Sequence, residues 1–335
     1  MRLMKIGYLG AGAWGYCLAS ILAMQGHQVR SWTTKADLAE KLNQDKKHPH
    51  LPLLKHQGDL HFTTDLASVL TEIDLLVESV TSAGIRPVFE KVKQIGIPHC
   101  PIVITSKGIE QNSGLILPEV VLSVLGEETK PQIGILSGPG YAEEVIRGLP
   151  TSVVASAYDP QVAKLICEAF TNKTFRVYPN SDILGVAFGG ALKNIVAIAC
   201  GVAEGLHLGS SAKAALITRG LHEIRKLAVA YGCSAETING LSGMGDLCMT
   251  CSSTISRNFR FGQLLAQGKS PDQSKHQIDM VVEGAYTAVS ALQLSKKAKI
   301  PMPITETIYK IIYEGLSPQK AVQILMERPI KEEQI

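Results

Sequence analysis

The sequence predicts an α/β protein in which a doubly wound parallel sheet is followed by an all-helical domain. Short, continuously apolar segments alternate with helical patterns up to about residue 180, as buried parallel strands do. A glycine-rich turn follows the first of these segments. Beyond residue 180 the strand signals stop and long helical patterns begin. We therefore predict a dinucleotide-binding domain over residues 1–185 and a helical substrate-binding and catalytic domain over 186–335.

The glycine-rich turn has the pattern G-x-G-x-x-G and lies between the apolar strand 4–9 and an apolar helix beginning at Tyr16. Its residues are Gly10, Ala11, Gly12, Ala13, Trp14 and Gly15. Glycine in this pattern allows a sharp turn, close approach of the backbone to a pyrophosphate, and tight packing of helix on strand. The helix N-terminus then offers free N–H groups to the anion. The turn predicts a Rossmann-like dinucleotide site; the alternative is a plain glycine-rich turn.

Seven further segments have the apolar character of strands. They are residues 28–32, 60–64, 73–78, 101–105, 133–136, 152–156 and 175–178. Ligands bind at the carboxyl ends of parallel strands. The glycine-rich turn, Lys107 and Gly138 each follow a predicted strand, so we expect all three at that edge. The alternative for Lys107 is an ordinary loop lysine.

The end of the second strand bears on the choice of cofactor. Many NAD-binding folds carry a carboxylate there for the ribose 2′-hydroxyl. This chain has Thr33, Thr34 and Lys35 instead, with Arg30 upstream. Basic residues without a carboxylate favour NADPH over NADH, or use of both. Lys35 could equally be a solvated loop charge.

Composition narrows the possible partners. The 335 residues carry a net charge of +3, too small to indicate nucleic acid, and the apolar runs are too short to predict membrane insertion. No signal peptide is expected before the first strand, and seven dispersed cysteines favour a reducing, cytoplasmic environment. We expect no metal: His48 and His50 are predicted in a solvent loop, and Cys248 and Cys251 as apolar packing residues.

The helical half contains the candidate catalytic residues. Helices are predicted over 182–204, 212–231, 255–267, 283–298, 304–314 and 318–326. Gly185, Gly189 and Gly190 lower helix propensity in the first of these, which suggests close packing of another segment or a ligand. Lys193 and Asn194 follow them in an apolar run. Burial would lower the pKa of Lys193 and make it a usable proton donor, unless its side chain reaches solvent.

Two further segments carry polar groups suited to a small anionic carbonyl substrate. Asp246 is predicted in a glycine loop, where it could bind a substrate hydroxyl, orient a lysine or cap a helix. Arg257 and Asn258 end a polar run, and the guanidinium matches phosphate oxygens. A surface arginine is the alternative for Arg257. Together these residues suggest a substrate bound between the two halves.

Eight motifs in this order resemble bacterial NAD(P)-dependent sn-glycerol-3-phosphate dehydrogenases. They lie at 10–15, 106–108, 137–139, 189–194, 216–220, 243–247, 256–258 and 281–284. The resemblance implies reduction of dihydroxyacetone phosphate, for glycerophospholipid synthesis, with Lys193 as the proton donor. It implies substrate contacts by Lys107, Gly138, Gly140, Lys193, Asn194, Asp246, Thr250, Ser256, Arg257 and Asn258. Cofactor contacts are expected from Gly10, Gly12, Ala13, Trp14, Gly15, Thr34, Lys35, Lys107, Ala142, Arg257, Val281 and Glu283.

The chain departs from the family pattern at three places. Ala13 stands where serine is frequent, and Gly140 where threonine or serine is usual. The strand ending at Glu78 lacks the usual Val-Pro-Ser. Two alternatives stay open: a related two-domain β-hydroxyacid dehydrogenase, and a dinucleotide-binding sensor without catalysis, which would need neither Lys193 nor Asp246. A homodimer is compatible with each.

Overall fold

A computed structural model describes residues 2–278, 280–330 and 332–333 of the chain. It divides into two compact units. The first comprises Met1–Lys107 and Leu117–Ile183, and the second comprises Gly108–Ile116 and Leu184–Ile335. The short segment Gly108–Ile116 therefore belongs to the helical unit, although it lies in the sequence between strands of the sheet.

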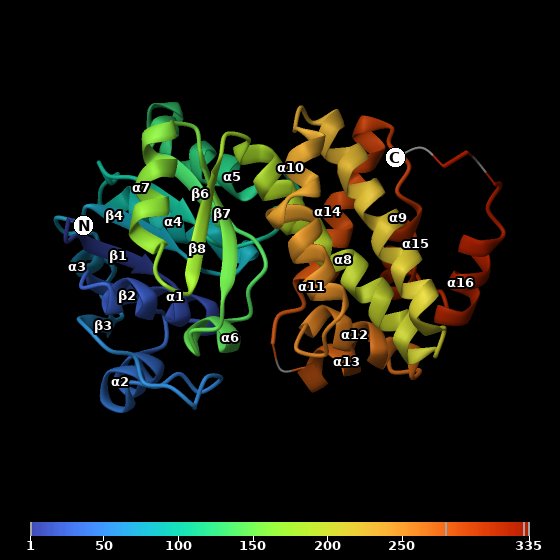
Figure 1. The fold of residues 1–335 in the computed structure, drawn as a ribbon, viewed down its shortest axis with the longest axis horizontal. Helices are drawn as coiled ribbons and strands as arrows, with labels where there is room; N and C mark the ends of the chain where they lie inside the picture. Colours follow the sequence, from blue (N-terminus) through green and yellow to red (C-terminus); the bar gives the residue numbers. More distant parts are fainter. Residues whose placement is uncertain (1, 279, 331, 334–335) are drawn as a thin grey trace. The chain divides into compact units, whose positions relative to one another are not determined.

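The first unit is built on one eight-stranded sheet (Figure 1). Its strands are β1 (Lys5–Leu9), β2 (Gln28–Trp32), β3 (Leu60–Thr63), β4 (Leu75–Glu78), β5 (Ile102–Ile104), β6 (Ile133–Ser137), β7 (Thr151–Ala157) and β8 (Phe175–Asn180). Their order across the sheet is β3-β2-β1-β4-β5-β6-β7-β8. All eight lie where the apolar segments predict them. The α/β class and the doubly wound amino-terminal sheet are confirmed.

The sheet is not wholly parallel, which corrects one expectation. β7 pairs with β6 in the antiparallel direction, while every other neighbouring pair is parallel. A parallel pair needs a crossover that returns the chain to the other end of the sheet. The connection from β6 to β7 contains only the five-residue helix α6 (Ala142–Ile146). At about 1.5 Å per residue, that helix is too short to span the length of β6.

Helices cover both faces of this sheet. They are α1 (Ala13–Met24), α2 (Ala36–Asp45), α3 (Leu66–Leu70), α4 (Ile85–Ile95), α5 (Leu117–Leu125), α6 and α7 (Pro160–Phe170), with short 3₁₀ turns η1 (Ser82–Gly84) and η2 (Glu127–Gln132). α1 packs against α6 and α7, whereas α4 packs against α3 and α5. β1 and β4 are therefore covered on both sides, which explains their continuous apolar sequences.

The predicted solvent loop around residue 48 is wrong for His48. This side chain is only 3% exposed, and its ring lies 5.5 Å from that of Tyr16. Nδ1 accepts a hydrogen bond from His50 N at 3.1 Å, so the proton lies on Nε2, which donates to Ala11 O at 3.2 Å. The Tyr16 hydroxyl donates to Lys46 O at 2.5 Å. These long-range contacts hold the loop around His48 against the glycine-rich turn. The Pro-containing sequence of the loop gives no sign of them.

The burial of His48 predicts an acid-sensitive first unit. Burial, and secondarily the charge of His50, lower the pKa of His48 from 6.5 to about 4. The unfolded chain then binds more protons than the folded one between these values, so stability falls as the pH drops from about 6.5 to 4. We expect a loss of about 1–2 kcal/mol at pH 5. His48→Gln can still donate to Ala11 O and should lose less, as denaturant unfolding at pH 7 and pH 5 will test. Equal losses in both proteins would contradict this assignment.

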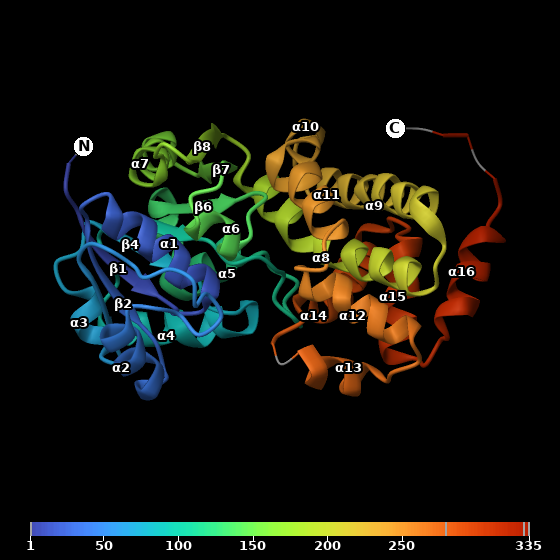
Figure 2. The same cartoon turned by 60° about the horizontal axis from the view of Figure 1, so that its bottom comes forward.

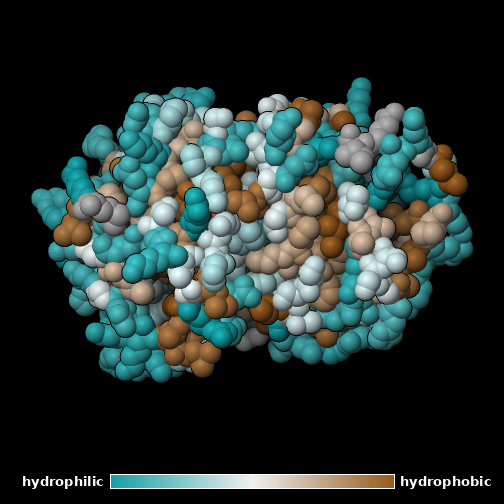
Figure 3. All heavy atoms as spheres, in the orientation of Figure 1, coloured by the Kyte–Doolittle hydropathy of each residue, from teal (hydrophilic) through white to brown (hydrophobic). Residues whose placement is uncertain are grey.

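The second unit is helical and is built around α8 (Ile183–Gly205). Figures 1 and 2 show the other helices of this unit, with α16 apart from α8. They are α9 (Gly209–Ala230), α10 (Ala235–Asn239), α11 (Asp246–Cys251), α12 (Arg257–Ala266), α13 (Pro271–Ile278), α14 (Glu283–Ala298), α15 (Pro303–Tyr313) and α16 (Pro318–Met326). α8 is long and apolar enough to cross a membrane, but 94% of its apolar window is buried within the protein. It is thus a core helix. On the face drawn in Figure 3, hydrophobic residues form scattered groups among hydrophilic ones.

The predicted glycine loop before Asp246 is helical, which is a second correction. Residues Leu241–Gly245 form a π-helical turn, η3, that continues directly into α11. Asp246 is the first residue of α11. Glycine-rich sequences read locally as loops, but this one is held helical by packing against α8.

Candidate active site

The glycine-rich turn has the backbone geometry that a bound dinucleotide needs. Gly10 has φ +104°, and a side chain there would meet Ser79 O at 2.7 Å. A side chain on Gly15 would meet Gly10 O at 2.3 Å, whereas one on Gly12 would meet nothing within 4 Å. Gly10 and Gly15 therefore serve the turn and its packing. Gly12 faces open space, where a phosphate can approach the backbone.

The N-terminus of α1 is free to bind an anion. The first intrahelical bond runs from Tyr16 N to Gly12 O at 2.8 Å, which leaves the N–H groups of Ala13, Trp14 and Gly15 without a helical acceptor. In the described part of the chain, no side chain caps this end. The residues present thus fit a dinucleotide pyrophosphate, which binds such N–H groups and the positive end of the helix.

Other predicted residues of the first unit gather near this turn. Lys107 and Gly138 follow β5 and β6, and Lys107 Nζ donates to Gly138 O at 2.9 Å. Ala142 begins α6, which packs against α1. A Cβ on Gly140 would lie 3.2 Å from the Trp14 indole. The indole therefore fills space that a larger side chain at 140 would need, which accounts for one departure from the family pattern.

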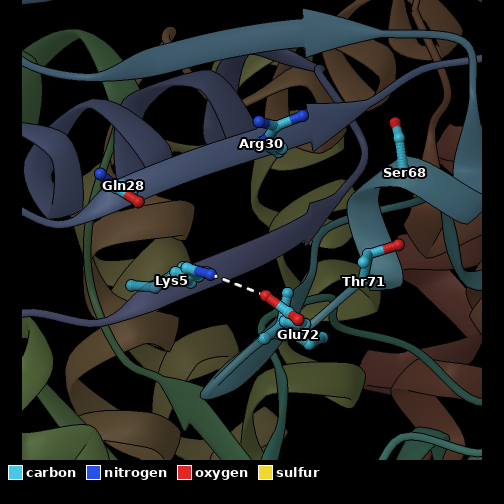
Figure 4. A pocket seen from close by; sticks show the side chains of 8 residues that line it. Lys5, Gln28, Arg30, Ser68, Thr71 and Glu72 are labelled. Carbon is cyan, nitrogen blue, oxygen red and sulfur yellow. Dashed lines mark hydrogen bonds and ion pairs between the residues drawn. The ribbon is translucent and has the colours of Figure 1, made fainter.

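The end of β2 provides Thr34 and Lys35, both exposed, directly before α2. Arg30 lies earlier in β2 and lines a different cavity of about 270 Å³ (Figure 4). That cavity also includes Lys5 and Gln28, the first residues of β1 and β2, so it lies toward the amino ends of the strands. Arg30 is thereby separated from Lys35. Of the residues predicted around the end of β2, Thr34 and Lys35 are the candidates for a ribose phosphate contact.

In the second unit, α8 and α11 bring a lysine and a carboxylate together. Lys193 is 6% exposed and Asp246 is fully buried. Lys193 Nζ is paired with Asp246 Oδ1 and donates to Thr250 Oγ1 at 2.7 Å. Thr250 Oγ1 in turn donates to Asp246 O at 2.6 Å. The lysine does not reach solvent, and the carboxylate stabilises its ammonium form, as a proton donor requires.

Two glycines make this pairing possible. A Cβ on Gly189 would lie 2.9 Å from Gly243 Cα, so α8 and η3 touch backbone to backbone. Gly189 is one helical turn before Lys193, and Gly243 is three residues before Asp246. The contact therefore sets the two functional side chains against each other. The predicted close packing at Gly189 is confirmed, and the partner is another segment of the chain.

Gly189→Ala is expected to separate α8 from η3. The new methyl group meets backbone atoms, which cannot move aside cheaply, so overpacking should cost about 1–3 kcal/mol of stability. Displacement of Lys193 from Asp246 should lower kcat, while the KM for the nicotinamide cofactor should change less, because the glycine-rich turn, Thr34 and Lys35 lie in the first unit. Thermal unfolding and steady-state kinetics of the purified variant test this. An unchanged kcat would show that the contact does not set the geometry of the pair.

Hydrogen bonds join Asn194, which follows Lys193, to Asn258, which follows Arg257. Asn258 Nδ2 donates to Asn194 Oδ1 at 3.0 Å, and Gly284 N donates to Asn258 Oδ1 at 2.9 Å. The side chains of Asn194 and Asn258 are buried. These hydrogen bonds connect α8, α12 and the first turn of α14, which begins with Glu283. The structure thus brings these predicted residues together; Val281 lies just before α14 and is 40% exposed.

Arg257 has the environment of an anion-binding residue. It begins α12, and burial lowers the pKa of its guanidinium while the nearby Glu283 opposes the shift. The preceding Ser256 caps the helix by accepting a hydrogen bond from Phe259 N at 3.2 Å, which leaves its hydroxyl proton available. A helix N-terminus with an arginine suits a phosphate.

The C-x-x-C pair, Cys248 and Cys251, lies on α11 with Asp246 and Thr250. Cys251 follows Thr250 and is buried, and a hydrogen bond with Cys200 together with burial raises the pKa of its thiol well above 9. Cys248 is half-buried, and burial raises its pKa as well. Neutral thiols of this kind act as apolar packing groups.

Sequence reasoning assigned no role to Glu78, the last residue of β4. It is fully buried, and its carboxyl oxygen is bonded to groups of two connecting segments. Two features of the sequence could have drawn attention to Glu78. It is a single carboxylate at the end of an otherwise apolar strand, and it lies where the chain lacks the usual Val-Pro-Ser.

Comparison with known proteins supplies the family. Residues 5–163 match the family described as NAD-dependent glycerol-3-phosphate dehydrogenase N-terminus, and residues 182–323 match its C-terminus counterpart. The chain belongs to the NAD(P)-dependent glycerol-3-phosphate dehydrogenase family. It is therefore an NAD(P)-dependent oxidoreductase, and the predicted family, enzyme class and cofactor class are confirmed.

Individual relatives in this glycerol-3-phosphate dehydrogenase family cover nearly the full chain. The chain is 64% identical to the enzyme named glycerol-3-phosphate dehydrogenase [NAD(P)+] from Protochlamydia amoebophila, over 99% of this chain and all of the relative. It is 56% identical to the enzyme of that name from Chlamydia pneumoniae, over 98% of each. The crystal structure of glycerol-3-phosphate dehydrogenase from Coxiella burnetii superimposes with a TM-score of 0.92 at 37% identity, covering 97% of this chain and 99% of that one.

Proposed function

We propose that this enzyme reduces dihydroxyacetone phosphate to sn-glycerol 3-phosphate, using NADPH in preference to NADH, and supplies the backbone of glycerophospholipids. The observation that carries the proposal is the buried Lys193–Asp246–Thr250 cluster, joined through Asn194 and Asn258 to Arg257. It combines a proton donor with an anion-binding group. A ketone that bears a phosphate needs both.

Lys193 is the proposed catalytic acid. A bound NAD(P)H would supply a hydride to the carbonyl carbon of the substrate. Lys193 Nζ gives its proton to the carbonyl oxygen as that oxygen gains negative charge. In the oxidation of glycerol 3-phosphate, the amine accepts the hydroxyl proton. Asp246 and Thr250 hold the ammonium in place and favour its charged form.

The phosphate is proposed to bind at the start of α12. Arg257 and Asn258 contact it, with Ser256 donating its free hydroxyl proton. Lys107, Gly138 and Gly140 complete the substrate contacts. The proposed cofactor contacts are the 10–15 turn, Thr34, Lys35, Lys107, Ala142, Arg257, Val281 and Glu283. We propose a dinucleotide-binding domain over residues 1–185 and a helical domain over residues 186–335.

The preference for NADPH rests on Thr34 and Lys35. Both are exposed at the end of β2, and the lysine can pair with a ribose 2′-phosphate. Cytoplasmic location and a homodimeric state are part of the same proposal. The free cysteines among the described residues support the cytoplasmic location, because a reducing compartment keeps thiols reduced.

Oxidation of NADPH by the purified enzyme with dihydroxyacetone phosphate tests the reaction directly. We expect turnover with the phosphorylated ketone and little with β-ketoacids that lack a phosphate. Binding of NADPH without turnover would instead indicate a sensor. The ratio of kcat/KM for NADPH and NADH decides the cofactor preference, and Lys35→Ala should move that ratio toward NADH.

A further inference from the structure

Glu78 is a buried carboxyl group at the edge of the sheet where the predicted cofactor residues lie. It ends β4, opposite Leu9 of β1 and Ile104 of β5. Its side chain is fully buried. A charged carboxylate is costly in such a place unless donors surround it. Its Oε2 has no hydrogen-bond partner among the described residues.

The other carboxyl oxygen joins two connecting segments. Glu78 Oε1 accepts a hydrogen bond from Val80 N, in the segment that follows β4. It also lies 2.8 Å from Ser106 Oγ, in the segment that follows β5, and Ser106 Oγ is bonded to Val80 O. Glu78 thus ties the end of β4 to the residue that immediately precedes Lys107.

The number of hydrogens shared by Glu78, Ser106 and Val80 indicates that the Glu78 carboxyl is protonated. The Ser106 hydroxyl has one hydrogen, but both of its neighbours, Glu78 Oε1 and Val80 O, are acceptors when the carboxyl is ionised. With a proton on Oε1, Glu78 donates to Ser106 Oγ and Ser106 donates to Val80 O. The contacts among Oε1, Ser106 Oγ and Val80 O then each have one donor and one acceptor, whereas Oε2 still has no partner among the described residues. Burial acts in the same direction and raises the pKa of Glu78 to about 8, against the hydrogen bonds that lower it.

Among the residues that the structure describes, the neighbouring elements add hydroxyl groups to this network and no positive charge bonded to the carboxyl. Tyr8 of β1 bonds Ser79 Oγ at 2.7 Å, and Thr105 donates to Glu78 O at 2.7 Å. Burial raises the pKa of Tyr8 far above its usual 10, and burial likewise raises that of Cys17 on α1, so both stay neutral. The segment that follows β5 contributes the Ser106 hydroxyl and the backbone N–H groups of Thr105 and Ser106 to the carboxyl. The Thr105 hydroxyl bonds the backbone oxygen of Glu78 instead.

The network touches both parts of the predicted cofactor site in the first unit. Side chains on Gly10 or Gly15 would meet Ser79, so the glycine-rich turn rests on the residue next to Glu78. On the other side, Lys107 follows Ser106 and donates to Gly138 O. A shift of Val80 or Ser106 would therefore move the turn and the lysine relative to each other.

We propose that Glu78, as a neutral acid, is a positioning residue that holds the glycine-rich turn and Lys107 in the geometry for cofactor binding. This inference rests on the proposed function, in which both contact the cofactor. Ionisation of Glu78 places a second acceptor against Ser106 and breaks the connection. Cofactor affinity should then fall as the pH rises through the pKa of this carboxyl.

The test compares wild type with Glu78→Gln, Glu78→Ala and the matched control Glu90→Gln, an exposed glutamate on α4. The dissociation constant of NADPH is measured by its fluorescence from pH 7 to pH 9. In wild type and Glu90→Gln it should rise about tenfold, because only about a tenth of the enzyme then holds the neutral acid. Glu78→Gln cannot ionise and should bind with a constant affinity. Glu78→Ala should bind weakly at every pH, so that glutamine rescues what alanine loses.

Infrared difference spectra, wild type minus Glu78→Gln, give a readout that a merely structural role would not produce. We expect the carbonyl band of a protonated carboxylic acid at pH 7 and its loss at pH 9. Absence of that band, or equal pH dependence of NADPH binding in wild type and Glu78→Gln, would overturn the inference even if alanine fails to fold. Neither readout needs turnover. A wild type that binds NADPH but leaves dihydroxyacetone phosphate unreduced would count against the proposed function and leave this test intact.

Discussion

Lys193→Met is expected to lower kcat for the reduction of dihydroxyacetone phosphate by about 10²–10⁴-fold, the usual contribution of a positioned general acid. Methionine fills much the same space but has no proton to give. The dissociation constant of NADPH should change little, because the glycine-rich turn is untouched. Lys226→Met, on the exposed surface of α9, is the control and should keep wild-type turnover.

Because Lys193 is paired with the buried Asp246, the single substitution can also destabilise the protein, and a second variant separates the two effects. Removing Lys193 leaves Asp246 buried beside Thr250 without its counterion, which typically costs about 3–5 kcal/mol of stability. Lys193→Met combined with Asp246→Asn removes both charges and should recover much of that loss. The double variant should melt near the wild-type temperature and still be inactive. Turnover within tenfold of wild type in a folded variant would remove Lys193 from the role of proton donor.

Arg257→Ala is expected to weaken binding of the phosphorylated substrate. A hydrogen-bonded charge pair with a phosphate contributes about 1.5–3 kcal/mol, so the KM for dihydroxyacetone phosphate should rise about 10- to 150-fold. The effect on kcat should be smaller, because the guanidinium is assigned to the phosphate and not to the carbonyl. Arg260→Ala, an exposed arginine on the same helix, is the matched control.

Dihydroxyacetone, which lacks the phosphate, makes this test specific. Wild type should reduce it poorly, and Arg257→Ala should reduce it no worse. An equal loss with both substrates would indicate that Arg257 supports the fold of α12, or the cofactor through Glu283. An unchanged KM for dihydroxyacetone phosphate would exclude it from the phosphate site.

Much of the fold follows from local patterns along the chain. The eight apolar segments predict the strands because a strand covered on both faces must be apolar throughout. The glycine spacing at 10–15 predicts a turn in which the φ of Gly10 and the close contacts at Gly10 and Gly15 require glycine. α14 and α16 begin and end where their sequence patterns place them. Such features depend on residues that are near one another in sequence.

Other features could not be predicted because their causes lie far away in the sequence. The direction of β7 depends on the short α6 and on where the chain lies when it returns to the sheet. His48 is buried because Tyr16 and Ala11 lie over it, and sequence around residue 48 has no sign of them. The helical form of residues 241–245 depends on Gly189, more than fifty residues earlier.

The candidate site likewise has features that the sequence predicted and features that it could not predict. The sequence by itself determined which side chains were available: a lysine in an apolar helix, a carboxylate among glycines, and an arginine at the end of a polar run. Only the tertiary structure decided that Lys193 pairs with Asp246 and that Asn194 bonds Asn258. It also decided that Glu78 joins two segments at the sheet edge. Helix and strand patterns record which face of an element is apolar, whereas a contact between elements depends on how both partners pack, and neither segment alone encodes that.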